Sequence, residues 1–294
     1  MIPLHYRWGH AINSRASLAT VQEEIQRAGK QQFATPNFVN AIEADIIWDK
    51  EQQTPVMGHP PATNGDLTFV DFLQTMLDIA GRFQRSMTSH DDMPFIVKCD
   101  FKSQQAFKAS LDLLATFIAQ YPFTRSVFIN ADILPGPESL GDVAFDAATF
   151  LKHFDDLGAI DNGKHRHKLV LSVGWTTVNG KDQDVYNNGY SHDMVDAMLR
   201  QLQPYGDRFV VTFPLRATSV RYSWPSLCQL LEQPNYGFTL WWALTQMSDD
   251  DLEWMYKTLE LDIHEEEPTA TRQSYAGRTF YDIKGFSRFL ARRK

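Results

Sequence analysis

Two acidic residues, Glu43 and Asp45, are the strongest candidates for chemistry, because they lie two positions apart in the apolar stretch 41–48. This stretch, AIEADIIW, is short and rich in β-branched residues, a composition that predicts a strand. Side chains alternate between the faces of a strand, so both carboxylates are expected on one face. Two neighbouring buried carboxylates need a cation or a shared proton. We interpret them as half of a metal site; the alternative is a solvated outer face.

A third carboxylate lies on the next strand-like stretch of this kind, where Lys98, Asp100 and Lys102 alternate on one face. Three charges that point the same way from a buried strand need partners, and Asp100 supplies the carboxylate that Glu43 and Asp45 lack. Oxygen ligands select a hard cation, Mg²⁺ or Ca²⁺. The sequence therefore predicts a metal site formed by these three acidic residues.

Two histidines, His10 and His59, each follow a glycine at the end of a strand-like segment. Histidine gains or loses a proton near neutral pH, so a pair of them can act as acid and base in one reaction. The alternative for each is a loop histidine with satisfied hydrogen bonds. The sequence has no glycine-rich phosphate loop, nucleophile elbow or HExxH motif, so a nucleotide cofactor is not expected.

The composition limits the partners and the compartment. The 294 residues carry a net charge of −8 and are 43% hydrophobic, which supplies a core and disfavours a nucleic-acid partner. No apolar run approaches membrane-spanning length, and strand-like sequence begins at once, so we expect neither a membrane span nor a secretory signal. Cys99 and Cys228 are expected to be buried free thiols. These features predict a cytoplasmic location.

Strand-like and helix-like segments alternate along the chain. The predicted strands are 4–8, 41–48, 55–59 (a strand or hairpin arm), 95–101, 127–134, 169–174, 209–213, 238–243 and 279–283. The predicted helices are 17–29, 67–83, 105–120, 145–157, 194–202, 224–231, 252–261 and 286–292. About eight such units predict a (β/α)8 barrel, and the absence of a linker predicts one domain over residues 1–294.

Polar residues gather near the ends of the predicted strands, where a barrel builds its active site. They are His10, Asp45, Asp100, Lys102, Asn130, Asp132, Thr176, Thr177, Arg216 and Trp241.

Several short motifs, in this order, resemble those of the menorin family. They are 10–14 (HAINS), 42–45 (IEAD), 59–61 (HPP), 98–102 (KCDFK), 130–134 (NADIL) and 171–177 (LSVGWTT), with 280–283 (FYDI) near the end. Menorins in turn resemble the glycerophosphodiester phosphodiesterases and the spider-venom phospholipases D, which are (β/α)8 barrels. Some animal menorins are described as cell-surface recognition proteins.

The resemblance implies roles for these residues. His10 and His59 would be the general acid and base, and Glu43, Asp45 and Asp100 would hold Mg²⁺.

Lys102 matches a phosphate-binding lysine of the venom enzymes, and Trp241 matches a pocket tryptophan, although Thr239 stands where an aromatic residue is expected. We expect the substrate to be bound by Lys98, Asn130, Arg216 and Trp241.

The sequence thus predicts a metal-dependent phosphodiesterase that acts on a phosphodiester small molecule or a lipid headgroup. Whether the nucleophile is water or a substrate hydroxyl, which would give a cyclic phosphate, stays open. One alternative is a barrel without turnover that serves as a binding module. Another is a glycoside hydrolase, for which two carboxylates would suffice but which leaves the histidines and Lys102 without a role.

Overall fold

The computed structural model describes residues 2–29, 38–86, 93–137, 143–177, 189–262 and 274–293. The chain divides into two compact units. The first unit comprises Tyr6–Ile133 and Ala144–Ser172, and the second comprises Ile2–His5, Leu134–Val143 and Val173–Lys294. The expectation of one domain over residues 1–294 stays a prediction.

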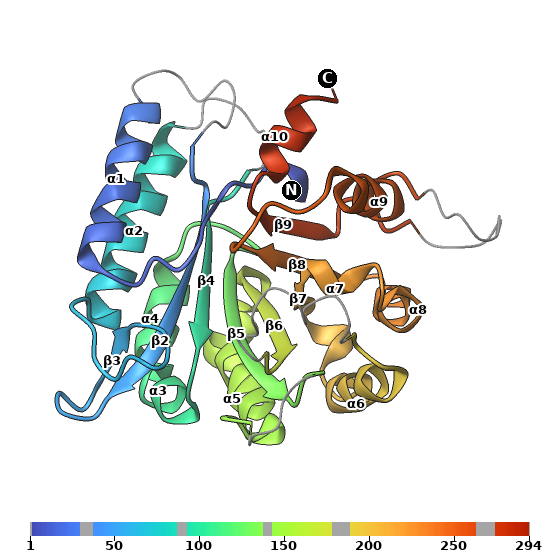
Figure 1. Cartoon of the computed structure of the whole chain (residues 1–294). Helices are drawn as coiled ribbons and strands as arrows, with labels where there is room; N and C mark the ends of the chain where they lie inside the picture. The colour runs from blue at the N-terminus through green and yellow to red at the C-terminus, as the bar shows by residue number, and fades with distance from the viewer. Residues whose placement is uncertain are drawn as a thin grey trace. The chain divides into compact units, whose positions relative to one another are not determined.

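The strands follow one another in the sheet in the order in which they occur in the chain (Figure 1). The order is β1 (Trp8–Gly9), β2 (Ala41–Asp49), β4 (Ile96–Phe101), β5 (Val127–Leu134), β6 (Leu169–Trp175), β7 (Val210–Arg216), β8 (Tyr236–Trp242) and β9 (Thr279–Ile283). Strands β1, β2, β4 and β5 pair in parallel, as do β7, β8 and β9. This succession, with helices between the strands, is that of a (β/α)8 barrel, so the predicted fold class is confirmed.

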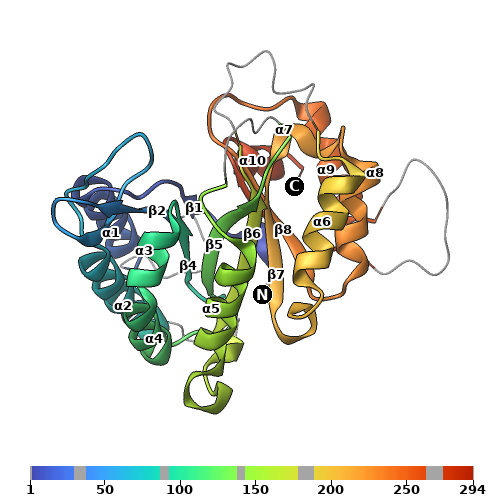
Figure 2. The ribbon, with the colours of Figure 1, turned by 90° about the horizontal axis from the view of Figure 1, so that it is seen from below.

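Helices connect consecutive strands in both units. They are α1 (Arg15–Gly29), α2 (Phe69–Ser86), α3 (Gln104–Ala109), α4 (Leu111–Gln120), α5 (Ala147–Ala159), α6 (His192–Leu202), α7 (Ala217–Val220), α8 (Trp224–Leu227), α9 (Asp249–Glu260) and α10 (Phe286–Ala291). Within the first unit, α2 to α5 cover one face of β4 and β5 (Figure 2). All six residues of β4 are buried, as expected of a parallel strand that is covered on both faces.

Three predicted elements differ from the structure. Residues 4–8 are not one strand: a 3₁₀ turn at Pro3–His5, closed by a hydrogen bond from the His5 N–H to the Ile2 carbonyl oxygen at 3.0 Å, precedes the short β1. The helix expected over 105–120 breaks at Ser110, whose hydroxyl donates a hydrogen bond to the Ala106 carbonyl oxygen at 2.7 Å. The helix expected over 224–231 is α8 followed by a 3₁₀ turn, Cys228–Glu232.

The stretch 55–59 contributes a hairpin arm. Strand β3 (Thr54–Met57) pairs with β2 in antiparallel fashion, outside the parallel series. Both cysteines are free thiols, but only Cys99 is buried, so the expected burial of Cys228 is wrong. Across the described ranges, no helix is both long enough and apolar enough to cross a bilayer.

Phe107 joins three elements of the first unit through aromatic contacts. Its ring centroid lies 5.1 Å from that of Phe101 on β4 and 4.7 Å from that of Phe150 on α5. All three side chains are buried, so this cluster anchors α3 and α5 to the strand that carries Asp100.

Replacing Phe107 with alanine should lower the free energy of unfolding by about 3–5 kcal/mol, because a large buried ring is lost and a cavity remains. The matched control is Val70→Ala on α2, whose side chain is half exposed and should change stability by about 0.5 kcal/mol or less. Chemical denaturation of both variants measures the difference. Equal denaturation midpoints would show that the cluster does not anchor the unit.

Candidate metal centre

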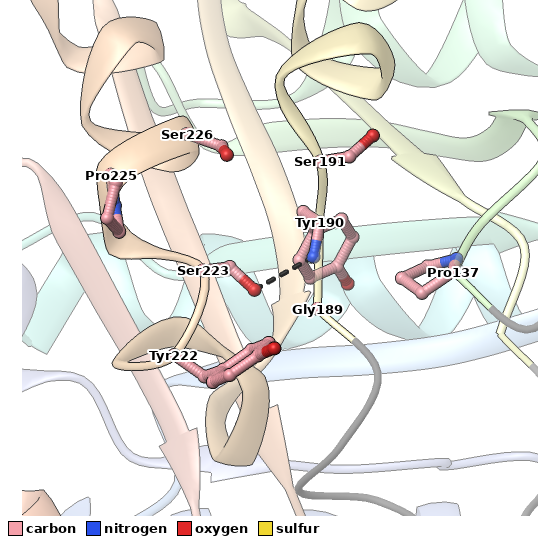
Figure 3. Close-up of a pocket in the computed structure, with 8 residues that line it drawn as sticks. All are labelled: Pro137, Gly189, Tyr190, Ser191, Tyr222, Ser223, Pro225 and Ser226. Carbon is pink, nitrogen blue, oxygen red and sulfur yellow. Dashed lines mark hydrogen bonds between the residues drawn. The ribbon is translucent and has the colours of Figure 1, made fainter.

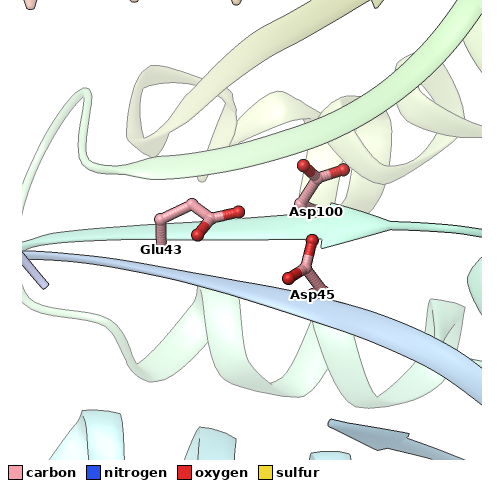
Figure 4. A group of neighbouring side chains, drawn as sticks. All are labelled: Glu43, Asp45 and Asp100. Atoms are coloured by element: carbon pink, nitrogen blue, oxygen red, sulfur yellow. The ribbon is translucent and has the colours of Figure 1, made fainter. Parts of the chain in front are cut away.

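Glu43 and Asp45 on β2 converge with Asp100 on the neighbouring strand β4 (Figure 4). The parallel register pairs Asp45 with Asp100 and Glu43 with Lys98, so all four side chains lie on one face of the two strands. One carboxylate oxygen from each acidic residue lies within 4.8 Å of the others, and all three residues are buried. The predicted convergence is confirmed.

The loop after β1 fixes two of these carboxylates. The Ala11 backbone N–H donates to Glu43 Oε2 at 2.8 Å. Asn13 Nδ2 donates to Asp45 Oδ2 at 2.7 Å, and Asn13 Oδ1 accepts from the Asp45 backbone N–H at 2.8 Å. Ala11 adopts a left-handed φ of 53°, which is uncommon for a residue other than glycine. The sequence alone assigned no role to Asn13. The feature that could have identified it is its position, since it is a short polar residue just beyond a barrel strand.

Asp100 is held from the other side by β5 and β6. Asn130 Nδ2 donates to Asp100 Oδ1 at 2.7 Å, and Asn130 Oδ1 accepts from the Ser172 hydroxyl at 2.5 Å. Asn130 is 1% exposed, so its amide is placed to orient Asp100. The expected contact of Asn130 with substrate stays a prediction.

Lys102 contacts the two aspartate oxygens that Asn13 and Asn130 do not bind. Its Nζ lies 2.9 Å from Asp45 Oδ1 and 2.8 Å from Asp100 Oδ2. Each aspartate therefore has one oxygen held by an asparagine and the other directed at a cationic group. A positive charge already fits between Asp45 and Asp100, and three carboxylates are the hard oxygen donors that Mg²⁺ and Ca²⁺ prefer. The donor set fits a divalent cation.

Burial and charge shift the pKa values of these groups in opposite directions. Burial and the neighbouring charge of Asp45 raise the pKa of Glu43. Burial also opposes ionisation of Asp100, but the ammonium groups of Lys102 and Lys98 outweigh it and lower the pKa of that carboxyl. Burial alone would lower the pKa of Lys102, yet the charges of Asp100 and Asp45 raise it well above its usual value. Lys102 is therefore an ammonium ion at neutral pH.

A fourth carboxyl group, Asp132, lies two residues beyond Asn130 on β5. Burial and the charge of Asp100 raise its pKa to about 7, although Lys102 and Lys98 act in the opposite direction. A carboxyl group with this pKa exchanges its proton near neutral pH. Sequence analysis noted Asp132 but assigned it no role.

The two histidines are placed differently. His10 Nδ1 lies 3.7 Å from Glu43 Oε2, and about a third of the side chain is exposed. His59 is exposed, and its Nδ1 lies 2.6 Å from the carbonyl oxygen of Pro60. The preceding Gly58 donates its backbone N–H to the Asp45 carbonyl oxygen at 3.0 Å, which ties the His59 segment to β2. The structure thus brings His10 close to Glu43 and ties the backbone next to His59 to β2 at Asp45.

Arg216 and Trp241 lie at the ends of β7 and β8 in the second unit. They are register partners, and the Arg216 guanidinium lies 5.7 Å from the centroid of the Trp241 ring. Thr239, two residues before Trp241, exchanges a hydroxyl hydrogen bond of 2.8 Å with Thr212. The expected contacts of Arg216 and Trp241 with substrate stay predictions.

The second unit also contains a cavity of about 550 Å³ (Figure 3). Tyrosine, serine and proline side chains line it, and the Tyr190 backbone N–H donates to the Ser223 hydroxyl at 2.8 Å. The predicted site residues are not among the residues that line this cavity.

The sequence comparison decides the family. The model of the menorin N-terminal domain matches residues 4–262, which is most of the chain. The chain belongs to the menorin family. This menorin-family chain is 32% identical to human Protein FAM151B over 242 residues, which cover 80% of this chain and 71% of the human protein. The expected family is confirmed.

Solved structures show weaker likeness to this menorin-family chain. A glycerophosphodiester phosphodiesterase from Thermotoga maritima is 11% identical with a TM-score of 0.41, over 98% of each chain. A putative dihydrodipicolinate synthase family protein from Coccidioides immitis is 11% identical with a TM-score of 0.43, over 99% of this chain and 74% of that one.

Replacing Asn13 with alanine should lower the free energy of unfolding by about 1–3 kcal/mol, because Asp45 loses the partners of its Oδ2 and its backbone N–H inside the protein. The control is Thr20→Ala on α1, which removes an exposed hydroxyl bond to the Ala16 carbonyl oxygen and should change stability by about 0.5 kcal/mol or less. Thermal denaturation compares the two variants. If both were equally stable, Asn13 would not hold Asp45.

Replacing Asp132 with asparagine should remove a pH dependence of stability. The folded pKa of about 7 lies above the unfolded value of 3.8, so the wild type loses stability as the pH rises between these values. The variant should therefore gain stability relative to wild type from pH 4 to pH 8, by about 1.4 kcal/mol for each pH unit between the two pKa values.

Asp146→Asn serves as the control, because Asp146 is an exposed cap of α5 whose pKa is lowered by its hydrogen bonds to Thr149. Its stability difference from wild type should stay flat between pH 5 and pH 8. Denaturation curves at several pH values decide the matter, and parallel behaviour of the two variants would contradict the raised pKa of Asp132.

Proposed function

We propose that this menorin-family chain is a metal-dependent phosphodiesterase. The observation that carries the proposal is the convergence of Glu43, Asp45 and Asp100 on one point, beside the ammonium of Lys102 and the imidazole of His10. Phosphoryl chemistry needs three kinds of group: carboxylates that hold a divalent cation, a lysine, and a histidine. Family membership agrees with this set of residues.

The three carboxylates would hold Mg²⁺, or Ca²⁺ in its place. When bound, such an ion neutralises charge on phosphate oxygens. The remaining chemistry belongs to the side chains of the protein, and the two histidines would move its protons.

His59 is suited to accept a proton. A carbonyl oxygen can only accept, so the 2.6 Å contact with Pro60 places the proton of the neutral ring on Nδ1. The Nε2 lone pair of His59 is then available as a general base. His10 is suited to donate, because its imidazolium form is attracted to the Glu43 carboxylate 3.7 Å away.

The proposed substrate is a phosphodiester small molecule or a lipid headgroup. Lys102 and Lys98 supply the positive charge for one phosphate, whereas the net charge of −8 disfavours a long polyanion. Asn130, Arg216 and Trp241 stay candidates for substrate binding, and a cytoplasmic location stays a prediction from sequence.

A binding module without turnover is the second candidate, and one observation favours it. The single ammonium of Lys102 pairs with both Asp45 and Asp100, so a side chain of the protein already offsets part of the negative charge that a metal would neutralise. A phosphate headgroup would then be bound but not cleaved.

The test is incubation with glycerophosphocholine and lysophosphatidylcholine in the presence of Mg²⁺, Mn²⁺ or Ca²⁺, with chelator as the control. Turnover should require the metal, and ³¹P NMR should show either a phosphomonoester from attack by water or a cyclic phosphate from attack by a substrate hydroxyl. Saturable binding of these compounds without turnover under all three ions would reject the enzyme in favour of the binding module.

Two single variants, His10→Ala and His59→Ala, should each lower turnover by roughly 10²–10⁴-fold, which is the usual contribution of a general acid or base. Stability should change little, because His59 is exposed and His10 is partly so. His153→Ala on α5 is the control, since its Nδ1 faces Asp156 at 3.8 Å outside the cluster. Turnover of the His59 variant equal to that of the control would remove His59 from the mechanism.

A further inference from the structure

The hydrogen bonds around the two aspartates divide their oxygens into two kinds. Asn13 holds Asp45 Oδ2 and Asn130 holds Asp100 Oδ1, at 2.7 Å in each case. The remaining oxygens, Asp45 Oδ1 and Asp100 Oδ2, are the two that the Lys102 ammonium contacts. A divalent cation at this cluster would need the same two oxygens. The ammonium and the metal are therefore competitors for one position.

The side chain of Lys102 can leave this position without disturbing the backbone. The backbone N–H of Lys102 donates to the Ile46 carbonyl oxygen at 2.9 Å, and the following Ser103 caps α3. The side chain is 19% exposed, and its ammonium lies at the end of a flexible four-carbon stem. Rotation about the bonds of this stem therefore carries the ammonium toward solvent. Lys98 differs, because it lies within β4 and is only 5% exposed.

We propose that Lys102 is the internal counter-ion of the acidic cluster, that a divalent cation displaces it, and that the displaced ammonium then binds the anionic group of the ligand. This proposal rests on the proposed function for the nature of the anion, a phosphate. It adds that metal and phosphate bind cooperatively, because the metal releases the lysine that the phosphate needs. Coupling of this kind is reciprocal, so phosphate must also tighten the binding of metal.

The experiment measures Mg²⁺ binding to the full chain by calorimetry, with and without inorganic phosphate and with free Mg²⁺ corrected for phosphate complexes. In the wild type, phosphate should lower the Kd for Mg²⁺ by roughly tenfold, within the usual range of coupling. Lys102→Met should bind Mg²⁺ more tightly than wild type without phosphate, and phosphate should then have little effect.

Lys98→Met is the matched control, because it removes a buried positive charge that acts on Glu43 and Asp100 without an ion pair to either. If the loss of a nearby positive charge is enough to raise the affinity for Mg²⁺, the affinity should rise in this variant as well. The gain in Mg²⁺ affinity should be larger in Lys102→Met than in Lys98→Met.

A measurement on the wild type does not depend on the folding of a variant. Acetic anhydride labelling followed by mass spectrometry reports the accessibility of each lysine. Mg²⁺ should increase acetylation of Lys102 several-fold, and added phosphate should reverse the increase. Unchanged acetylation of Lys102 in protein that binds Mg²⁺ would overturn the proposal.

The outcomes separate this proposal from the proposed function. If neither wild type nor Lys102→Met binds Mg²⁺, with or without phosphate, both fail together. If wild type binds Mg²⁺ but phosphate has no effect, or if Lys102→Met binds Mg²⁺ no more tightly than Lys98→Met, the counter-ion role fails and the metal site stands.

Discussion

Repulsion between buried carboxylates is the constraint on which the centre depends. The parallel register of β2 and β4 places Asp45 directly beside Asp100, and like charges on neighbouring strands destabilise a sheet. The same register places Lys98 beside Glu43, and Lys102 reaches back to both aspartates. Charges of opposite sign therefore offset the repulsion between the acidic ones.

Hydrogen bonds fix the orientation of the two aspartate carboxylates. Amide groups from a loop and from a third strand each hold one oxygen of an aspartate, and the opposite oxygens face a cation. Ser172 on β6 orients Asn130 in turn, so four strands determine where the open oxygens lie. Groups fixed in this way bind a cation with little reorganisation, which is the requirement for an effective metal site.

The features that the sequence predicted correctly are those that follow from the periodic alternation of side chains along a strand. Alternation along β2 and β4 was sufficient to place the three carboxylates on one face, and β5 was predicted with its observed bounds, Val127–Leu134. Asn13 was missed as a functional residue because its contacts come from a loop, where no period applies. The break at Ser110 was missed because a serine hydroxyl bonded to the preceding turn leaves the apolar pattern of a helix intact. Alternation placed Lys102 on the face of Asp100, but it did not decide whether the long, flexible stem directs the ammonium to the carboxylates or to a phosphate.

Several features of the centre oppose the stability of the fold. Ala11 adopts a left-handed conformation, Asp132 keeps a proton that it would lose in water, and Glu43 is buried beside another acid. A sequence selected for stability alone would avoid each of them, and such departures concentrate where a protein binds or reacts. Since a (β/α)8 barrel supports many chemistries, the fold does not account for these costs. They are explained if the carboxylate oxygens at this centre are used, and two of these oxygens, Asp45 Oδ1 and Asp100 Oδ2, already face the ammonium of Lys102.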